Sequence, residues 1–281
     1  MSEFNSMKKD HKRENDKVIV AGVDVGSVNS KAVILINSEP ISFSEIRSQA
    51  PKESAVRVIN EALGRINLNL EDINYTVATG CGKNEVSFAQ KAISEISCAA
   101  KGAIKIWGQS VRTVLDAGGE SCKVIHCTES GRVVDFLWND KCASGIGFSF
   151  DSLAYLLNKE LKEIGKIGSE VDKFPEISDF CVVYARSEAF DLIRDKIPIE
   201  KIIAAYHYAM ARRMAVLVER LGLKEDFVVI GGMSRNQGIM VWLERILKQK
   251  PIEPKIKLDP TFSVAFGAAL FADSFYRQSK I

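Results

Sequence analysis

The chain of 281 residues lacks several patterns that would assign it to common classes of protein. It has no apolar run of about 18 residues or more, so we expect no transmembrane helix. The P-loop pattern G-x-x-x-x-G-K-[ST] and the dinucleotide pattern G-x-G-x-x-G are both absent, which argues against those two kinds of nucleotide site. The net charge is only +2 and the basic residues are spread along the chain, so we expect no nucleic-acid partner and no membrane partner.

No pair of cysteines has the C-x-x-C spacing, which argues against a zinc ribbon or a ferredoxin pattern within one chain. The first 17 residues are polar and predict a tail without a secretory signal, so we expect a cytoplasmic protein. Structural disulfides are rare in the reducing cytosol. The six cysteines are therefore expected to be buried thiols, a reactive thiol or metal ligands: Cys81, Cys98, Cys122, Cys127, Cys142 and Cys181.

The hydrophobic residues, 46% of the chain, suffice for one large core or two modest lobes. Short β-branched runs predict strands at 18–21, 31–36, 75–80, 112–119, 123–127, 133–138 and 227–230. Apolar residues at helical spacing predict helices at 54–66, 148–161, 187–195, 199–221 and 262–275, and a mostly helical segment at 84–107. A strand, an Asp/Gly turn and a returning strand occur twice. The order predicts an α/β fold with two lobes that face a cleft.

We place lobe I at 18–110, completed by 260–281, and lobe II at 111–259. Four segments are candidates for a nucleotide site in the cleft: 24–31, 116–121, 231–236 and 266–269. Glycines in the two hairpin turns let backbone N–H groups approach phosphates, and an aspartate before each turn can hold hydrated Mg²⁺. The candidate catalytic residues are Asp24, Asp116 and Glu120. The candidate nucleotide-binding residues are Gly26, Ser27, Lys31, Gly118, Gly119, Gly231, Gly232 and Asn236.

The order and spacing of these four segments resemble the actin/Hsp70/sugar-kinase superfamily. The resemblance implies two lobes of RNase H type around a nucleotide cleft, with ATP or ADP and Mg²⁺ as ligands. Lys31 could neutralise phosphate charge, or it could be a solvated strand residue.

Two cysteines each stand just before a predicted helix, in the segments Asn139–Gly147 and Ile177–Glu188. The positive end of a helix dipole favours a thiolate and an electron-rich cluster. Cys142 and Cys181 alone cannot complete the four-thiolate shell of a [4Fe–4S] cluster. If both are ligands, a second copy must supply the other pair, and the cluster lies on the two-fold axis of a dimer.

These segments closely resemble the activator ATPases of 2-hydroxyacyl-CoA dehydratases and the ATPase subunits of benzoyl-CoA reductases. The motifs are Asn-Asp-Lys-Cys-Ala at 139–143, Ala-Thr-Gly-x-Gly-Lys-Asn at 78–84 and Ser-Glu-Ile-Ser-Cys at 94–98. The resemblance covers residues 18–272. It implies one [4Fe–4S] cluster per dimer, shared with a second copy or a paralogous subunit. It also implies that ATP drives a low-potential electron from ferredoxin or flavodoxin to a partner dehydratase or reductase.

The chain departs from the family at two positions. Gly-Gly-Gln-Asp is replaced by Gly-Gly-Glu120-Ser121, and Ala-Glu-Ser-Glu by Ala-Arg186-Ser-Glu. The alternatives are a small-molecule kinase and a nucleotide-binding regulator of the same fold, both without a cluster. Three further residues could suggest a second metal site, namely Cys122, His126 and Cys127. We expect Cys81 and Cys98 to be packing residues, and His207 to be an ordinary residue of a long helix.

Overall fold

The computed structural model describes residues 17–139 and 145–281, which form two compact units. Unit 1 contains the described residues up to Ile93 together with Ala268–Ile281. Unit 2 contains Ser94–Gly267. Every helix in the described residues is too short or too polar to cross a membrane.

Unit 1 is built on a five-stranded sheet in the order β3-β2-β1-β4-β5. Its strands are β1 (Ile19–Val25), β2 (Asn29–Ile36), β3 (Glu39–Arg47), β4 (Tyr75–Thr79) and β5 (Lys91–Ala92). Helix α2 (Pro51–Gly64) packs on one face, where Val58, Ile59 and Leu63 are buried with the strands. Two short 3₁₀ turns follow, η2 (Leu70–Asp72) and η3 (Lys83–Glu85).

Unit 2 is built on a four-stranded sheet in the order β8-β7-β6-β9. Its strands are β6 (Thr113–Ala117), β7 (Cys122–Cys127), β8 (Val133–Asn139) and β9 (Phe227–Ile230). The helices are α3 (Glu95–Trp107), α4 (Ile146–Leu157), α5 (Leu161–Glu170), α6 (Val182–Arg194), α7 (Ile199–Leu221) and α8 (Gln237–Leu247), with 3₁₀ turns η4 (Gly232–Arg235) and η5 (Pro260–Phe262). The last helix, α9 (Ser263–Gln278), begins in unit 2 and ends in unit 1.

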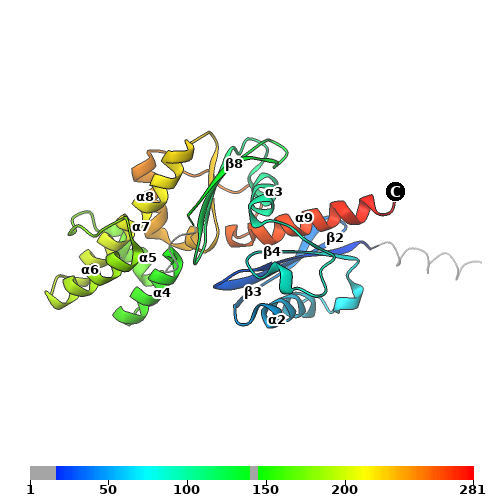
Figure 1. Ribbon diagram of the computed structural model, residues 1–281, viewed down its shortest axis with the longest axis horizontal. Coiled ribbons are helices and arrows are strands. Elements are labelled where there is room, and N and C mark those ends of the chain that lie inside the picture. Colours follow the sequence, from blue (N-terminus) through cyan, green and yellow to red (C-terminus); the bar gives the residue numbers. More distant parts are fainter. Residues whose placement is uncertain (1–16, 140–144) are drawn as a thin grey trace, which may run out of the picture. The chain divides into compact units, whose positions relative to one another are not determined.

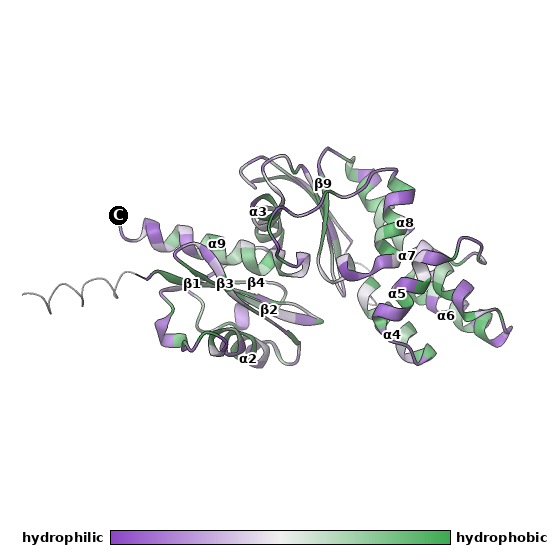
Figure 2. Ribbon diagram, turned by 180° about the vertical axis from the view of Figure 1, so that it is seen from behind, coloured by the Kyte–Doolittle hydropathy of each residue, from purple (hydrophilic) through white to green (hydrophobic). Residues whose placement is uncertain are grey.

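The two sheets repeat one topology. In each, the first two strands form an antiparallel hairpin, the third strand adds antiparallel beside the second, and the fourth pairs parallel with the first. Helix α3 and helix α7 cover opposite faces of the second sheet (Figure 1). Along α7 and α8 the hydropathy alternates between hydrophobic and hydrophilic stretches, as expected for helices with one face on the core (Figure 2). The predicted α/β fold with a repeated strand–turn–strand unit is confirmed.

Several local predictions were wrong. The segment 84–107 is helical only from Glu95, where the Ser94 side chain accepts a hydrogen bond from the Ser97 amide and caps α3. The predicted helix at 148–161 ends at Leu157, because Asn158 adopts a left-handed conformation at the end of α4. Helix α6 begins at Val182, five residues before the predicted start. The strands β3 and β5 and the helices α5 and α8 were not predicted.

Candidate functional site

The first hairpin places Asp24 at the end of a fully buried strand. Asp24 is 8% exposed and lies beside Gly80, where an added Cβ would come within 2.5 Å of Asp24 Oδ1 and of the Val25 carbonyl oxygen. A Cβ at Gly26 would lie 2.6 Å from the Asn29 carbonyl oxygen. The two glycines therefore allow backbone to pass close to the carboxylate and allow the turn to close tightly.

Lys31 stands directly opposite Asp24 in the antiparallel pair of β1 and β2. Side chains at paired positions share one face of a sheet, so the ammonium and the carboxylate belong to the same surface. Lys31 Nζ lies 3.9 Å from Glu45 Oε1 on β3, and the Lys31 side chain is only 12% exposed. Of the two interpretations left open by the sequence, the solvated strand residue is wrong. The phosphate role stays a prediction.

The second hairpin repeats this arrangement in unit 2. Asp116 is 5% exposed, and the Gly118 amide closes the turn by donating to the Ser121 carbonyl oxygen at 3.0 Å. Lys123 stands opposite Asp116, as Lys31 does opposite Asp24. The two hairpins thus share the spacing Asp-x-Gly-x-x-x-x-Lys. Lys123 was not among the predicted site residues, although an alignment of the two hairpins would have found it.

The glycine pair after β9 approaches Asp116 from the neighbouring strand. Ile230 pairs with Asp116 in the parallel register, and Gly231 follows with φ +83°. A Cβ at Gly231 would lie 2.6 Å from the Ala117 carbonyl oxygen and 2.9 Å from Asp116 Oδ1. The structure therefore brings Gly231, Asp116 and the Gly118 turn together at one end of the second sheet.

Two other candidate residues have different surroundings. The Asn236 side-chain oxygen accepts a hydrogen bond from the Ile239 amide at 3.1 Å and caps α8. The same oxygen lies 3.1 Å from His207 Nε2. Glu120, in contrast, is exposed on the turn of the second hairpin. Asn236 is therefore engaged in holding α8 and α7, and its contact with nucleotide stays a prediction.

The turn of the second hairpin is packed against the start of α4. The Phe148 amide donates to the Gly119 carbonyl oxygen at 3.1 Å. A Cβ at Gly147 would lie 2.5 Å from Gly119 Cα, and one at Gly145 would overlap the Gly119 carbonyl oxygen. The turn and the first residues of α4 are therefore too closely packed for one to move without the other. These residues of α4 follow the segment that contains Cys142.

Cys142 itself lies outside the described residues. Cys181 is the N-cap residue of α6, is half-buried and carries a free thiol. Within the described residues, no side chain caps the first amides of α6. Arg213 Nη1 donates to the carbonyl oxygens of Asp179 and Phe180, and Glu188 accepts from the Ser178 amide at 2.6 Å. The loop before Cys181 is thus fixed from both sides, with the thiol at a helix N-terminus.

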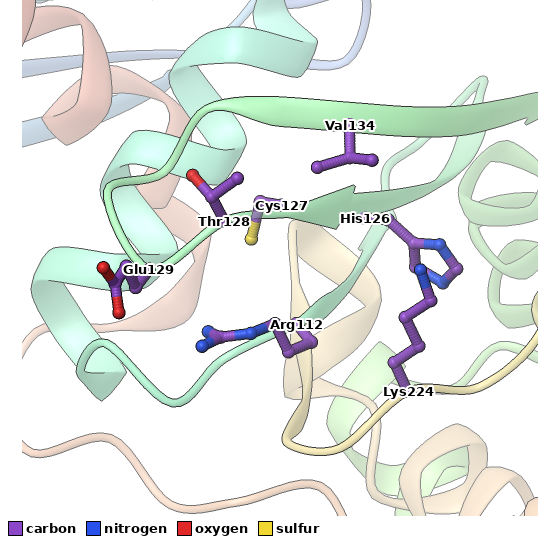
Figure 3. Close-up of a pocket in the computed structure, with 7 residues that line it drawn as sticks. All are labelled: Arg112, His126, Cys127, Thr128, Glu129, Val134 and Lys224. Carbon is purple, nitrogen blue, oxygen red and sulfur yellow. The ribbon is translucent and has the colours of Figure 1, made fainter.

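The other cysteines do not form a second metal site among residues 17–139 and 145–281. Burial raises the pKa of the Cys122 thiol to about 12 and that of Cys127 to about 11, so neither favours the thiolate that a metal requires. His126 Nε2 is hydrogen-bonded to the Gly222 carbonyl oxygen at 2.7 Å. Figure 3 shows the Cys127 sulfur turned away from the His126 ring in a pocket of about 390 Å³. Cys98 is buried as predicted, whereas Cys81 is exposed and the packing prediction for it was wrong.

His207 lies in the long helix α7, as predicted, and is a buried core residue. Its Nδ1 bonds to the Ile203 carbonyl oxygen at 2.8 Å, and the ring packs 4.5 Å from that of Phe150. Added Cβ atoms at Gly168 and Gly238 would overlap the ring. Burial lowers the pKa of His207 from 6.5 to about 4, because the charged form would lose its hydration.

We therefore expect acid to destabilise unit 2 before carboxylates are protonated. His207 binds a proton in the unfolded chain below about pH 6.5 but in the folded chain only below about pH 4. Its contribution to the free energy of unfolding falls through that window, by about 2 kcal/mol at pH 5. Urea unfolding at pH 7 and pH 5 measures the loss. His207→Gln should make the free energy of unfolding depend less on pH between these two values, and an unchanged dependence in His207→Gln would contradict the assignment.

Comparison with known families places the two hairpins and the Gly231 turn inside a matched region that covers most of the chain. Residues 21–272 match the BadF/BadG/BcrA/BcrD ATPase family. The chain belongs to this family. The 2-hydroxyisocaproyl-CoA dehydratase activator of Clostridioides difficile is 38% identical over 260 residues, which are 92% of this chain and 96% of that protein.

Solved structures agree with this membership. The activator of the 2-hydroxyisocaproyl-CoA dehydratase from Clostridium difficile with bound ADPNP has a TM-score of 0.87 and 35% identity, covering 94% of this chain and 97% of that one. A ROK family glucokinase from Streptomyces griseus, at 12% identity and a TM-score of 0.54, covers 91% of this chain and 99% of that one. It supports the shared sugar-kinase-like fold alone. The predicted resemblance to dehydratase activators and the predicted fold class are confirmed.

Proposed function

We propose that this family member hydrolyses ATP in order to pass a low-potential electron to a 2-hydroxyacyl-CoA dehydratase or a related reductase. The observation that carries the proposal is the contact between the Gly118–Glu120 turn and the start of α4. It connects a phosphate-binding type of turn to the segment that contains Cys142. A kinase that phosphorylates a small molecule has no need of such a connection to a cysteine.

The two aspartates are suited to hydrated Mg²⁺, which prefers carboxylate oxygen ligands and keeps several waters. Asp24 and Asp116 each lie near the end of a buried strand and beside a glycine. Because the glycine has no side chain, backbone atoms lie close to each carboxylate. We assign to them the binding of Mg²⁺ and the orientation of the attacking water, assisted by Glu120.

The backbone amides of Gly26, Ser27, Gly118 and Gly119 would bind phosphates, because phosphoryl transfer depends on positioning and charge neutralisation. Lys31 would add positive charge beside Asp24. Gly231 and Gly232 would lie against the adenosine, and Asn236 would hold the helix that follows.

Cys181 fits a cluster ligand, since its thiol lies at a helix N-terminus whose amides favour negative charge. With Cys142 it gives two thiolates per chain, so we propose that two copies, or one copy and a paralogous subunit, share one [4Fe–4S] cluster. Bound there, the cluster would supply the low-potential electron. The exposed side chains of Phe180, Val183 and Tyr184 around Cys181 support a second chain at this surface.

The role of nucleotide is then mechanical. Phosphates at the Gly118 turn would shift it, and the turn would shift the start of α4 and with it the Cys142 segment. This would change the environment of the shared cysteines and the surface offered to the dehydratase. ATP would gate the transfer, and ferredoxin or flavodoxin would reduce the chain beforehand.

An anaerobic assay with a 2-hydroxyacyl-CoA dehydratase tests the proposal. We expect the prereduced chain to reduce the dehydratase only when ATP and Mg²⁺ are present, and to hydrolyse ATP without any small-molecule phosphate acceptor. Product formation by the dehydratase and phosphate release are measured together. ATP turnover that requires a sugar or an organic acid, with no effect on the dehydratase, would instead indicate the kinase.

A further inference from the structure

Lys123 is a buried cation at the second hairpin for which the proposed mechanism has no role. Its side chain is only 3% exposed. The ammonium lies 2.8 Å from Ser121 Oγ, 3.1 Å from Glu95 Oε2 and 3.5 Å from Asp116 Oδ2. A buried lysine is stable only when its charge is well paired, so this arrangement of oxygens is part of the folded state.

The matching lysine of unit 1 is paired differently. Lys31 finds Glu45 directly across on the third strand of its sheet. At the equivalent place in unit 2, the residue across from Lys123 is Trp138, whose ring centre lies 5.4 Å from the ammonium. The third strand of unit 2 thus offers no carboxylate there. Lys123 is therefore shared between Asp116 on the hairpin and Glu95 in the first turn of α3.

The carboxylate of Asp116 has two distinguishable oxygens. Oδ2 is the oxygen that faces Lys123. Oδ1 is the oxygen that faces Gly231. An ammonium at one oxygen opposes a divalent cation at the same carboxylate, since like charges repel strongly where water is scarce.

We propose that Lys123 is a positioning residue that competes with Mg²⁺ for Asp116, and that Glu95 weakens this competition by drawing the ammonium away. The proposal rests on the proposed function, in which Asp116 binds Mg²⁺. Together, Glu95, Lys123 and Asp116 then determine the Mg²⁺ concentration that nucleotide binding requires. The Ser121 hydroxyl also holds the ammonium by a hydrogen bond, but it does not neutralise the positive charge.

The test is a Mg²⁺ titration of the binding of a fluorescent ATP analogue to the full chain. Glu95→Gln leaves the ammonium to Asp116, and the Mg²⁺ concentration at half-saturation is expected to rise roughly five- to tenfold. The double variant Lys123→Met with Glu95→Gln removes the ammonium while keeping the net charge of the group. Its half-saturation is expected to fall below that of the wild type. Lys224→Met, an exposed charge change in the same unit, is the control and should leave the titration unchanged.

The outcomes separate the possible explanations. If the double variant needs as much Mg²⁺ as Glu95→Gln alone, Lys123 does not compete and the inference is wrong. If neither variant moves the titration, and only the number of folded binding sites falls, Lys123 is merely structural. Should the double variant fail to fold, Lys123→Gln with Glu95→Gln takes its place, because it keeps the same net charge and a polar side chain beside Ser121.

Asp116→Asn separates the inference from the proposed function. If that change leaves the wild-type Mg²⁺ dependence intact, the assignment of Mg²⁺ to Asp116 fails and the inference fails with it. If it removes the dependence while the Lys123 and Glu95 variants behave as wild type, only the inference fails.

Discussion

Replacing Asp116 with Asn is expected to lower kcat for ATP hydrolysis by about 10²- to 10³-fold, the usual effect of removing one preorganised electrostatic group. The change keeps the shape of the side chain but removes the charge that we assign to hydrated Mg²⁺. Folding should survive, because Lys123 keeps Glu95 and Ser121 as partners. Phosphate release at saturating ATP and Mg²⁺ measures the effect.

The matched control is Asp135→Asn on strand β8 of the same unit, where the aspartate is exposed. It removes the same charge from the second sheet without touching the hairpin, so turnover should equal that of the wild type. Undiminished turnover in Asp116→Asn, with thermal unfolding like that of the wild type, would show that the second hairpin is not the catalytic one.

Replacing Cys181 with Ser is expected to remove nearly all bound iron from protein purified without oxygen. In the proposed dimer of identical chains, the change deletes one thiolate from each chain. The remaining pair of thiolates cannot complete the four-thiolate shell of the cluster. Iron and sulfide analysis per two chains measures the loss, and the molar mass in solution should fall to that of one chain as the shared ligand set is lost.

Cys81→Ser is the control, since Cys81 is a solvent-accessible cysteine that lies in unit 1 beside Val25. It should keep the iron content of the wild type. Equal iron in Cys181→Ser and in the wild type would exclude Cys181 as a ligand and remove the geometric reason for a dimer.

The sequence allowed prediction of the parts of the fold that are specified locally. The turns after Asp24 and Asp116 could be predicted because glycine and a small polar residue follow a β-branched run. The strand β3 could not, because its pattern is inverted. Ser42 and Ser44 face inward and donate to the carbonyl oxygens of Ala62 and Val58 on α2, while Ile41 is exposed.

Tertiary packing decided helix α5 as well. Helix α5 contains Gly165 and Gly168, which weaken its intrinsic helix propensity. Gly165 lies 3.2 Å, measured from an added Cβ, from Asn236 Oδ1, and Gly168 makes room for the buried His207 ring. The glycines thus allow close contact between helices that are distant in sequence. No local pattern reveals such a contact, and the same holds for the pairing of Lys123 with Glu95.

The iron content of the anaerobically purified wild-type chain, read together with its visible spectrum and its mass in solution, tests the central claim most directly. We predict a brown dimer with about four irons per two chains, whose broad visible absorption bleaches in air. A colourless, iron-free protein that binds ATP as a single chain would contradict the claim that two copies share a cluster.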